Sequence, residues 1–451
     1  MSSINFVDLF AGLGGIRLGF EQAASKLGVK TSCILTSEIK PSAIEALNHI
    51  HPGEKVDNDV RKVKIKKKAR SLHVVLGGFP CQAFSAAGKG LGFMDTRGTL
   101  FFEIERLIEE SKNVGRKPKG FILENVEGLV RHGEHIDGSP YGSTLTTIVN
   151  KLKAAGYHTE VLVLDSANYG LPQSRVRVYI VGIDDAYAPV DLKNLPRSTK
   201  TFGEIMDHGL PTVDSPLTRK LLEMYSPEEL EGKSMKDKRG GTTNIHSWDV
   251  ELKGPVSSEE KLFLNELLHE RRKHQWADII GIDWMDGMPL TTEQISSFWK
   301  HKGLQKMLDH LVEKKYLVLE HPKKRVRHTD GINVSYTREP DTTKPKGYNI
   351  VTGKLSFEFS QFLDPSKPTP TMVAMDMHKI GVIDNGGIRH LSISEGLKLF
   401  GYAPDTLSYL EERKNGKDIA FDLLGNSVCV PVIELLAERL LLAISKGKRH
   451  E

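Results

Sequence analysis

Short apolar runs alternate with longer amphipathic stretches through roughly the first 185 residues of the chain. The runs have the length and composition of buried strands, and the stretches between them are long enough for helices. This alternation predicts a mostly parallel sheet covered by helices, which is an α/β fold. The predicted strands span residues 4–9, 32–36, 73–76, 120–123, 160–165 and 177–183.

The pattern changes after residue 185, where proline, charged residues and glycine pairs become more frequent. Ordered, moderately apolar sequence resumes near Lys367 and ends in a helix predicted over 430–445. A chain of 451 residues exceeds the usual size of a single core. We therefore predict three parts, over residues 1–188, 189–365 and 366–451.

Residues 257–335 form a unit of their own within the middle part. Amphipathic stretches over 258–271, 291–300 and 304–314 precede an apolar run at 316–320 and a basic turn. Three helices and a β ribbon resemble a winged helix, whose wing would place positive charge on phosphates. The alternative is an ordinary helical insert with a solvated loop. The basic residues of the predicted wing are Lys323, Lys324, Arg325 and Arg327.

Composition restricts the class of protein. Lys and Arg total 62 against 58 for Asp and Glu, so the net charge of +4 does not argue for nucleic acid binding by the whole chain. The basic run at 61–70 is typical of a solvated face. Cys33, Cys81 and Cys429 show no C-x-x-C spacing, which favours a reducing compartment and argues against a structural zinc site. No signal peptide and no run of roughly 18 apolar residues is evident, so we expect a cytoplasmic protein that does not span a membrane.

Cys81 is the strongest candidate for a reactive side chain. It follows Pro80 and a glycine pair at the carboxyl end of a predicted strand, where open α/β sheets bind their ligands. This placement favours a nucleophile over a crosslink. The alternative is a buried, inert thiol.

A glycine-rich turn follows the first predicted strand, over residues 10–15. Glu38 follows the second strand, where its carboxylate could accept both hydroxyls of a ribose, and Asp59 could accept from an adenine amino group. A full G-x-G-x-x-G motif is missing, which argues against a nicotinamide dinucleotide. These residues indicate a nucleoside cofactor.

A second carboxylate, Glu124, follows another predicted strand, and Arg175 and Arg177 alternate on one strand face. A carboxylate and two guanidinium groups beside a thiol would form a polar reaction pocket. Taken singly, Glu124 could instead meet a helix dipole, and the arginines could lie on an exposed strand face.

Seven elements occur in the order typical of one family. They are residues 6–15, 78–82, 95–100, 124–126, 173–177, 389–395 and 425–428. In this order, and above all in Pro80-Cys81-Gln82 and Glu124-Asn125-Val126, the chain resembles the DNA cytosine-5 methyltransferases of prokaryotic restriction-modification systems. The likeness covers roughly residues 4–185 and 366–445. It implies the Rossmann-like fold of methyltransferases that depend on S-adenosylmethionine. Residues 189–365 would form a smaller target-recognition domain, and residues 366–451 would return to the catalytic core.

The resemblance also implies a mechanism. Methyl transfer from S-adenosylmethionine would reach carbon 5 of a cytosine flipped out of duplex DNA, after Cys81 adds to carbon 6. Glu124 would hold N3 and the amino edge of the base, Arg177 would hold O2, and Arg175 would order Glu124.

By the same likeness, a defined set of residues binds the cofactor and another contacts DNA. The loop would be formed by Phe10, Gly12, Leu13, Gly14 and Gly15; the ribose and adenine would lie against Glu38, Ile39, Asp59 and Val60; and Pro80, Leu100, Asn426 and Val428 would close the pocket. The position of Asn426 implies that the C-terminal helix packs beside the first strand. Residues 83–93 would form a loop that closes on DNA, with Ser85 and Arg97 directed to phosphates.

We expect double-stranded DNA as the partner, a monomer, and functional pairing with a restriction endonuclease that requires no physical contact, in a bacterial or archaeal cytoplasm. Two alternatives are a DNA-binding transcriptional regulator that uses the winged-helix-like insert and a tRNA cytosine-5 methyltransferase. Intact Cys81 and Glu124 argue against the first, and the long insert argues against the second.

Overall fold

The computed structural model describes residues 3–57, 59–64, 71–80, 100–330, 333–352 and 357–448. The chain forms two compact units. Unit 1 comprises Met1–Asp207, Asp364–His378 and Leu391–Glu451, and unit 2 comprises His208–Leu363 and Lys379–His390. The limits at residues 188 and 365 stay predictions of where the functional domains divide.

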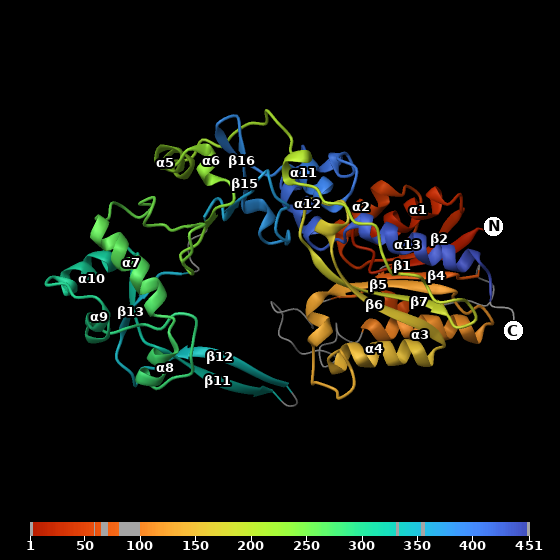
Figure 1. The fold of residues 1–451 in the computed structure, drawn as a ribbon, viewed down its shortest axis with the longest axis horizontal. Helices are drawn as coiled ribbons and strands as arrows, with labels where there is room; N and C mark the ends of the chain where they lie inside the picture. The colour runs from red at the N-terminus through yellow and green to blue at the C-terminus, as the bar shows by residue number, and fades with distance from the viewer. Residues whose placement is uncertain are drawn as a thin grey trace. The chain divides into compact units, whose positions relative to one another are not determined.

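A seven-stranded sheet forms the centre of unit 1, in the order β3-β2-β1-β4-β5-β7-β6 (Figure 1). Strand β7 runs antiparallel to both of its neighbours, whereas the pairs β3-β2, β2-β1, β1-β4 and β4-β5 are parallel. The predicted mostly parallel α/β fold is therefore confirmed. The strands are β1 (Ile4–Leu9), β2 (Thr31–Ser37), β3 (Val56–Asp57), β4 (Val74–Gly78), β5 (Gly120–Val126), β6 (Tyr157–Asp165) and β7 (Val176–Asp184).

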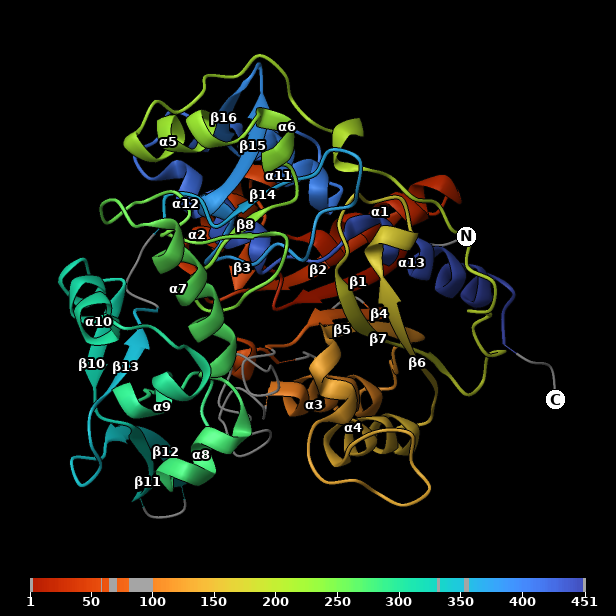
Figure 2. The ribbon, with the colours of Figure 1, turned by 60° about the vertical axis from the view of Figure 1, so that its left-hand side comes forward.

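Helices cover both faces of this sheet, as Figures 1 and 2 show. Ile4 and Phe6 of β1 pack in one cluster with α1 (Gly15–Lys26) and α13 (Val430–Ser445). Val7 and Leu9 of the same strand pack in a second cluster with α3 (Phe101–Asn113) and α4 (Ser143–Ala154). Because successive strand residues point to opposite faces, one apolar strand contributes to both clusters.

The two helices on the first face approach each other closely at Gly19. A Cβ atom at this position would lie 2.8 Å from the carbonyl oxygen of Val430 and 2.8 Å from Cβ of Ile433. The missing side chain thus permits α13, near the end of the chain, to pack against α1, near its beginning. This contact holds the start of α13 against α1, and Ser427 and Val428, which precede α13, lie close to Gly15 at the start of α1.

The remaining helices of unit 1 lie at the edge of the sheet and in the returning segments. The α-helices are α2 (Pro41–Ile50), α11 (Ile393–Phe400) and α12 (Gly416–Gly425). Short 3-10 helices are η1 (Val60–Lys62), η4 (Glu127–Arg131), η5 (Ser166–Asn168), η6 (Phe202–Glu204), η7 (Met377–Lys379), which continues into unit 2, and η8 (Ser408–Leu410).

Two apolar clusters lie among the described residues of unit 2. One lies around a five-stranded sheet in the order β16-β15-β14-β8-β9, and the other lies among four helices and a strand pair, β10-β13. The elements around the sheet are α5 (Pro216–Met224), α6 (Pro227–Leu230), β8 (Ser234–Met235), β9 (Asn244–Ile245), β14 (Gln361–Phe362), β15 (Ile380–Asp384) and β16 (Gly387–His390). The elements of the helical part are α7 (Ser258–Glu270), α8 (His274–Ile280), α9 (Thr292–Phe298), α10 (Leu304–Glu313), β10 (Leu317–Glu320), β11 (Lys323–Asp330), β12 (Asn333–Pro340) and β13 (Gly347–Ile350).

The helical part contains the three predicted helices and the predicted ribbon, together with α8, which the sequence did not indicate. Helix α8 has only 7 residues, and no side chain caps its first turn at Lys273, so the usual signals of a helix start are weak. The assignment of this part as a winged helix stays a prediction.

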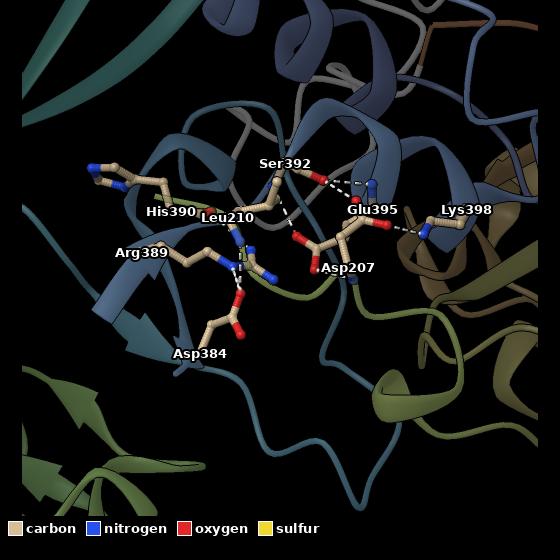
Figure 3. A network of polar contacts seen from close by, with 8 residues as sticks. All are labelled: Asp207, Leu210, Asp384, Arg389, His390, Ser392, Glu395 and Lys398. Carbon is tan, nitrogen blue, oxygen red and sulfur yellow. Dashed lines mark hydrogen bonds and ion pairs between the residues drawn. The ribbon is translucent and has the colours of Figure 1, made fainter. Parts of the chain in front are cut away.

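Buried polar contacts secure the chain where it passes between the units (Figure 3). In unit 1, Glu395 accepts hydrogen bonds from the main-chain nitrogens of Asp207 and Ser392, at 2.9 and 2.8 Å. In unit 2, Asp384 accepts a bond of 2.9 Å from Nε of Arg389, and both of these side chains are almost fully buried. Each unit therefore fixes, by its own contacts, the end of the chain segment that leaves it. Residues 389–395, one of the seven elements noted in the sequence, supply Arg389, Ser392 and Glu395 to these contacts.

Candidate active site

A cavity of about 700 Å³ opens in unit 1 at the carboxyl ends of the parallel strands. Its size is typical of pockets that bind small ligands, and its place is where open α/β sheets hold theirs. Twelve of the predicted site residues line it. They are Phe10, Gly12, Glu38, Ile39, Asp59, Val60, Pro80, Leu100, Glu124, Arg175, Arg177 and Asn426.

The turn after β1 adopts left-handed backbone conformations at three positions. Gly12 and Gly14 have φ angles of 55° and 76°, which glycine adopts without a steric penalty. Phe10 has a φ of 57°, a conformation that is uncommon for a residue with a side chain and that tends to occur at ligand sites. The backbone of this turn is thus shaped to bring Phe10 and Gly12 to the cavity.

Four residues predicted to bind the cofactor do not line the cavity: Leu13, Gly14, Gly15 and Val428. Gly15 instead permits close packing, because a Cβ there would lie 2.8 Å from Cγ2 of Val428 and would collide with the hydroxyl of Tyr402. Gly15 and Val428 therefore pack against each other outside the cavity lining and support the glycine turn.

Glu38 connects the glycine turn to the start of α2. Its Oε2 accepts a hydrogen bond of 2.7 Å from the nitrogen of Gly12, and its Oε1 accepts bonds of 2.8 Å from the nitrogens of Ile39 and Lys40. The carboxylate is therefore held in one orientation at the cavity wall. The neighbouring Ile39 is 70% exposed and offers an apolar surface to a ligand.

Asp59 forms a two-point contact with Arg61. The Nε and one terminal nitrogen of Arg61 donate to the two carboxylate oxygens, each at 2.9 Å. The hydrogen bond from Arg61 lowers the pKa of Asp59, so this carboxylate is ionised at neutral pH. An adenine amino group would have to share Asp59 with Arg61.

These residues fit a nucleoside cofactor such as S-adenosylmethionine. Glu38 provides an oriented acceptor for ribose hydroxyls, and the apolar side chains of Ile39, Val60 and Leu100 can enclose a purine. The acidic residues of the wall also suit a ligand that carries a sulfonium charge and an ammonium charge.

Glu124 and Arg177 form a buried ion pair in the same cavity. The Nε of Arg177 lies 3.2 Å from Oε1 of Glu124, and the two side chains are 13% and 12% exposed. Burial raises the pKa of Glu124, and the positive charges of Arg177 and then Arg175 oppose part of that rise. The carboxyl group of Glu124 therefore binds a proton more readily than an exposed glutamate does.

Arg175 donates its hydrogen bonds to the main chain of the returning segment, and its role in ordering Glu124 stays a prediction. The terminal nitrogens of Arg175 donate to the carbonyl oxygens of Met372, Gly425 and Ser427, at 2.8, 3.0 and 2.8 Å. The three carbonyls of the returning chain need donors in a buried place, and the guanidinium group supplies them, while its charge also acts on Glu124. Arg177 is the arginine that contacts Glu124.

Arg175 thereby fixes the residues on both sides of Asn426, which lines the cavity. Burial, together with the nearby charge of Arg177, lowers the pKa of Arg175 to about 10, so it is still protonated at neutral pH. The charged guanidinium group bonds carbonyls from two separate segments and so holds the returning chain against the residue that precedes β7.

Two further contacts at the site were not predicted from the sequence. Lys40 forms an ion pair with Asp422, and both residues line the cavity. The hydroxyl of Tyr402 lies 2.5 Å from Oγ of Ser427, behind the glycine turn. Each pair joins residues distant in sequence, so no local pattern could have shown it.

Three predicted residues, Cys81, Ser85 and Arg97, lie outside the described residues. Pro80, which precedes Cys81 in the chain, lines the cavity together with Glu124 and Arg177. Lys323, Lys324, Arg325 and Arg327 belong to β11 of unit 2.

Comparison with known proteins agrees with this arrangement. The family of C-5 cytosine-specific DNA methylases matches residues 4–442. The chain belongs to this family. The methylase is 51% identical to the type II methyltransferase M.NlaIV of Neisseria lactamica, over 98% of this chain and 99% of the relative. It is 50% identical to the type II methyltransferase M.NgoBV of Neisseria gonorrhoeae over the same shares of both chains.

The fold is also similar to a solved structure, that of the methyltransferase EhMeth from Entamoeba histolytica, with a TM-score of 0.53 and 14% identity over 98% of this chain and 99% of the other. The relatives support neither of the two alternatives, a transcriptional regulator or a tRNA methyltransferase. Among the described residues of the methylase, no helix has the length and apolarity needed to cross a bilayer.

Proposed function

We propose that this methylase transfers a methyl group from S-adenosylmethionine to carbon 5 of cytosine in duplex DNA, as the modification enzyme of a type II restriction-modification system. The observation that carries the proposal is the buried pair of Glu124 and Arg177 in the same cavity as Glu38. A proton-sharing carboxyl beside a nucleoside site is the arrangement that this reaction needs. The full-length similarity to two type II methyltransferases supports the biological setting.

S-Adenosylmethionine, when bound, supplies a methyl group on a positively charged sulfur. Glu38 would hold the ribose, with Ile39 and Val60 against the purine and Asp59 at its amino group. Phe10, Gly12, Pro80, Leu100 and Asn426 would complete the pocket. Leu13, Gly14, Gly15 and Val428 would act by supporting the turn.

Cys81 is proposed as the nucleophile. Carbon 5 of cytosine is a poor nucleophile, and a thiolate bond to carbon 6 turns the ring into an enamine whose carbon 5 can accept a methyl group. After transfer, a base removes the proton from carbon 5, the double bond re-forms, and the bond between Cys81 and carbon 6 breaks. The thiolate is regenerated, so it acts as a catalyst.

Glu124 would hold N3 and the amino group of a flipped cytosine and share a proton with N3 while Cys81 adds. A neutral ring accepts the thiolate poorly, and proton sharing at N3 compensates for the charge that enters the ring. Arg177 positions Glu124 and would bind O2 of the base. Arg175 would act indirectly, by positioning the carbonyls on both sides of Asn426.

We further propose that residues 189–365 form the target-recognition domain, and that Ser85 and Arg97 contact DNA phosphates. The methylase would act as a monomer in a prokaryotic cytoplasm. Its pairing with a restriction endonuclease would be functional and would need no contact between the two proteins, because each acts on DNA by itself.

The decisive experiment combines trapping with substitution. Duplex DNA that contains 5-fluorocytosine should form a covalent adduct with the wild-type protein, because the fluorine cannot leave as a proton does, and peptide mapping should place the adduct at Cys81. Cys81→Ser should bind DNA without forming the adduct or methylating it, whereas Cys33→Ser, the matched control, should behave as wild type. Full methylation by Cys81→Ser would refute the nucleophile.

Two further measurements complete the test. Bisulfite sequencing of DNA from expressing cells should show methylated cytosine within one short sequence, and its absence would refute the function. Glu124→Gln should form the covalent adduct much more slowly while binding S-adenosylmethionine nearly as tightly as wild type, since Glu124 is assigned to the base. A large loss of cofactor affinity would show that Glu124 belongs to the cofactor site.

A further inference from the structure

The ribbon formed by β11 and β12 has two chemically different faces. Residues directly opposite in an antiparallel pair share a face, and successive residues alternate between faces. The register pairs Lys323 with Pro340, Arg325 with Arg338, and Arg327 with Tyr336. We call these six residues the arginine face. Lys324, Val326, His328, Thr337 and Glu339 form the opposite face.

Side-chain contacts agree with this division. The guanidinium carbon of Arg325 lies 3.7 Å from the ring centre of Tyr336, so these two side chains share the arginine face. On the opposite face, His328 lies 2.5 Å from the hydroxyl of Thr337 and 3.5 Å from the carboxylate of Glu339. The opposite face therefore contains the acid that balances its own positive charge.

The arginine face carries excess positive charge. Its four cationic residues include Arg325 and Arg338 directly opposite each other, and like charges at opposite positions destabilise a strand pair. Lys323 is the member with an acidic neighbour, at 3.7 Å from Glu320. Among the side chains that the structure describes, no carboxylate lies within ion-pair distance of Arg325 or Arg327. A polyanion would relieve this repulsion.

The arginines are also held in place. The ring of Tyr336 supports the plane of the Arg325 guanidinium, which leaves its N–H edge open for a two-point contact. Arg338 donates to the carbonyl oxygen of Trp284 at 2.8 Å, which ties the ribbon to the loop after α8. Figure 1 shows the ribbon as a two-stranded arm beside α8. A two-stranded ribbon of this kind fits the major groove of duplex DNA.

We propose that the arginine face of this ribbon is a DNA-contacting surface of the methylase, with Arg325 and Arg327 donating through their guanidinium edges to acceptor atoms of DNA, while Lys324 and Glu339 on the opposite face point away from the duplex. The inference rests on the proposed function. It also narrows the earlier expectation, because Lys324 leaves the set of DNA contacts and Arg338 and Tyr336 join the surface. A guanidinium edge pairs in the same way with a phosphate or with O6 and N7 of guanine.

The test compares single charge removals on the two faces. Arg325→Gln and Arg327→Gln each remove one charge from the arginine face, and Lys324→Gln removes one charge from the same strand on the other face. Binding of each full-length variant is measured by fluorescence anisotropy between 50 and 200 mM salt. Two short duplexes are used, one with the methylated site found by bisulfite sequencing and one without it. Melting temperature and S-adenosylmethionine affinity should equal those of wild type, which shows that the fold is intact.

We expect each arginine-face variant to bind the site duplex about tenfold more weakly, and Lys324→Gln to stay within about twofold of wild type. A uniform loss on both duplexes, with a salt slope reduced by about one, identifies a phosphate contact. A loss confined to the site duplex identifies guanine. Tyr336→Ala should weaken binding as Arg325→Gln does.

Equal effects on the two faces, or a larger effect of Lys324→Gln, overturn the proposal. If the wild-type protein methylates DNA and all of these variants bind DNA as tightly as wild type, the proposed surface is wrong but the proposed function still holds. Wild-type protein that neither binds nor methylates duplex DNA would refute the proposed function.

Discussion

The Nε atom of Arg177 lies 3.2 Å from Oε1 of Glu124, at the end of the paired strands β5 and β7. Both groups are nearly buried, so the ion pair acts through a medium that screens charge weakly. The protonation of Glu124 thus depends on Arg177 as well as on burial.

Arg177→Gln should raise the pKa of Glu124 further. Burial already raises this pKa, and Arg177 is the largest influence that lowers it, so its removal leaves desolvation less opposed. Carbon-13 NMR of glutamate-labelled protein would measure the titration, with the signal assigned by its loss in Glu124→Gln. Arg131→Gln, an exposed substitution on η4, should leave the signal unchanged. An unchanged or lower pKa in Arg177→Gln would contradict the prediction.

Arg175→Lys should weaken both folding and cofactor binding. A lysine ammonium cannot reproduce the planar fork that bonds Met372, Gly425 and Ser427, and each buried carbonyl left without a donor costs about 1–3 kcal/mol. Urea unfolding and calorimetric titration with S-adenosylmethionine would measure the two effects. Arg177→Lys is the matched control, since Arg177 is not bonded to these carbonyls, and it should retain cofactor affinity. Full cofactor affinity in Arg175→Lys would show that the Asn426 segment is positioned by other contacts.

Gly19→Ala should destabilise the protein although alanine favours helices. In an exposed helix the change would stabilise by about 1 kcal/mol. Here the new Cβ would lie 2.8 Å from the carbonyl oxygen of Val430, and such overpacking costs about 1–3 kcal/mol. Urea unfolding would give the sign of the change, and Ser25→Ala on the exposed side of α1 should be neutral or slightly stabilising. A gain in stability from Gly19→Ala would mean that α1 and α13 can separate without loss.

Asp8→Asn should change how stability depends on pH. Burial raises the pKa of Asp8 from 3.8 to about 7, with Arg17 opposing the rise and Glu21 and Glu38 adding to it, and neither carboxylate oxygen has a described hydrogen-bond partner. Since the folded protein then binds a proton that the unfolded chain has lost, this group's contribution to stability falls as the pH rises from about 4 to about 7.

Asparagine cannot ionise, so the stability of Asp8→Asn relative to wild type should increase across that range, by at most about 4 kcal/mol. Urea unfolding of both proteins at several pH values would test this. A difference that stays constant between pH 4 and 8 would show that folding does not raise the pKa of Asp8.

The sequence alone determined the positions of six strands of the large sheet and of the terminal helix. The expected strand at 4–9 is β1, and the expected helix at 430–445 is α13, with the same limits. Local periodicity is sufficient for this, because a buried strand or an amphipathic helix shows its pattern within a few residues. The same reasoning placed Glu38 and Glu124 at the ends of strands, and parallel strands bring such ends to one edge of the sheet.

Only the tertiary structure decided what these residues contact. Arg175 donates a hydrogen bond to a carbonyl 250 residues further along the chain, Lys40 forms an ion pair with Asp422, and Gly19 packs against α13. The two faces of the β11–β12 ribbon likewise depended on the register of its strands. The sequence specifies local conformation through propensity and period, whereas partners at long range follow from how the elements pack, which no local pattern records.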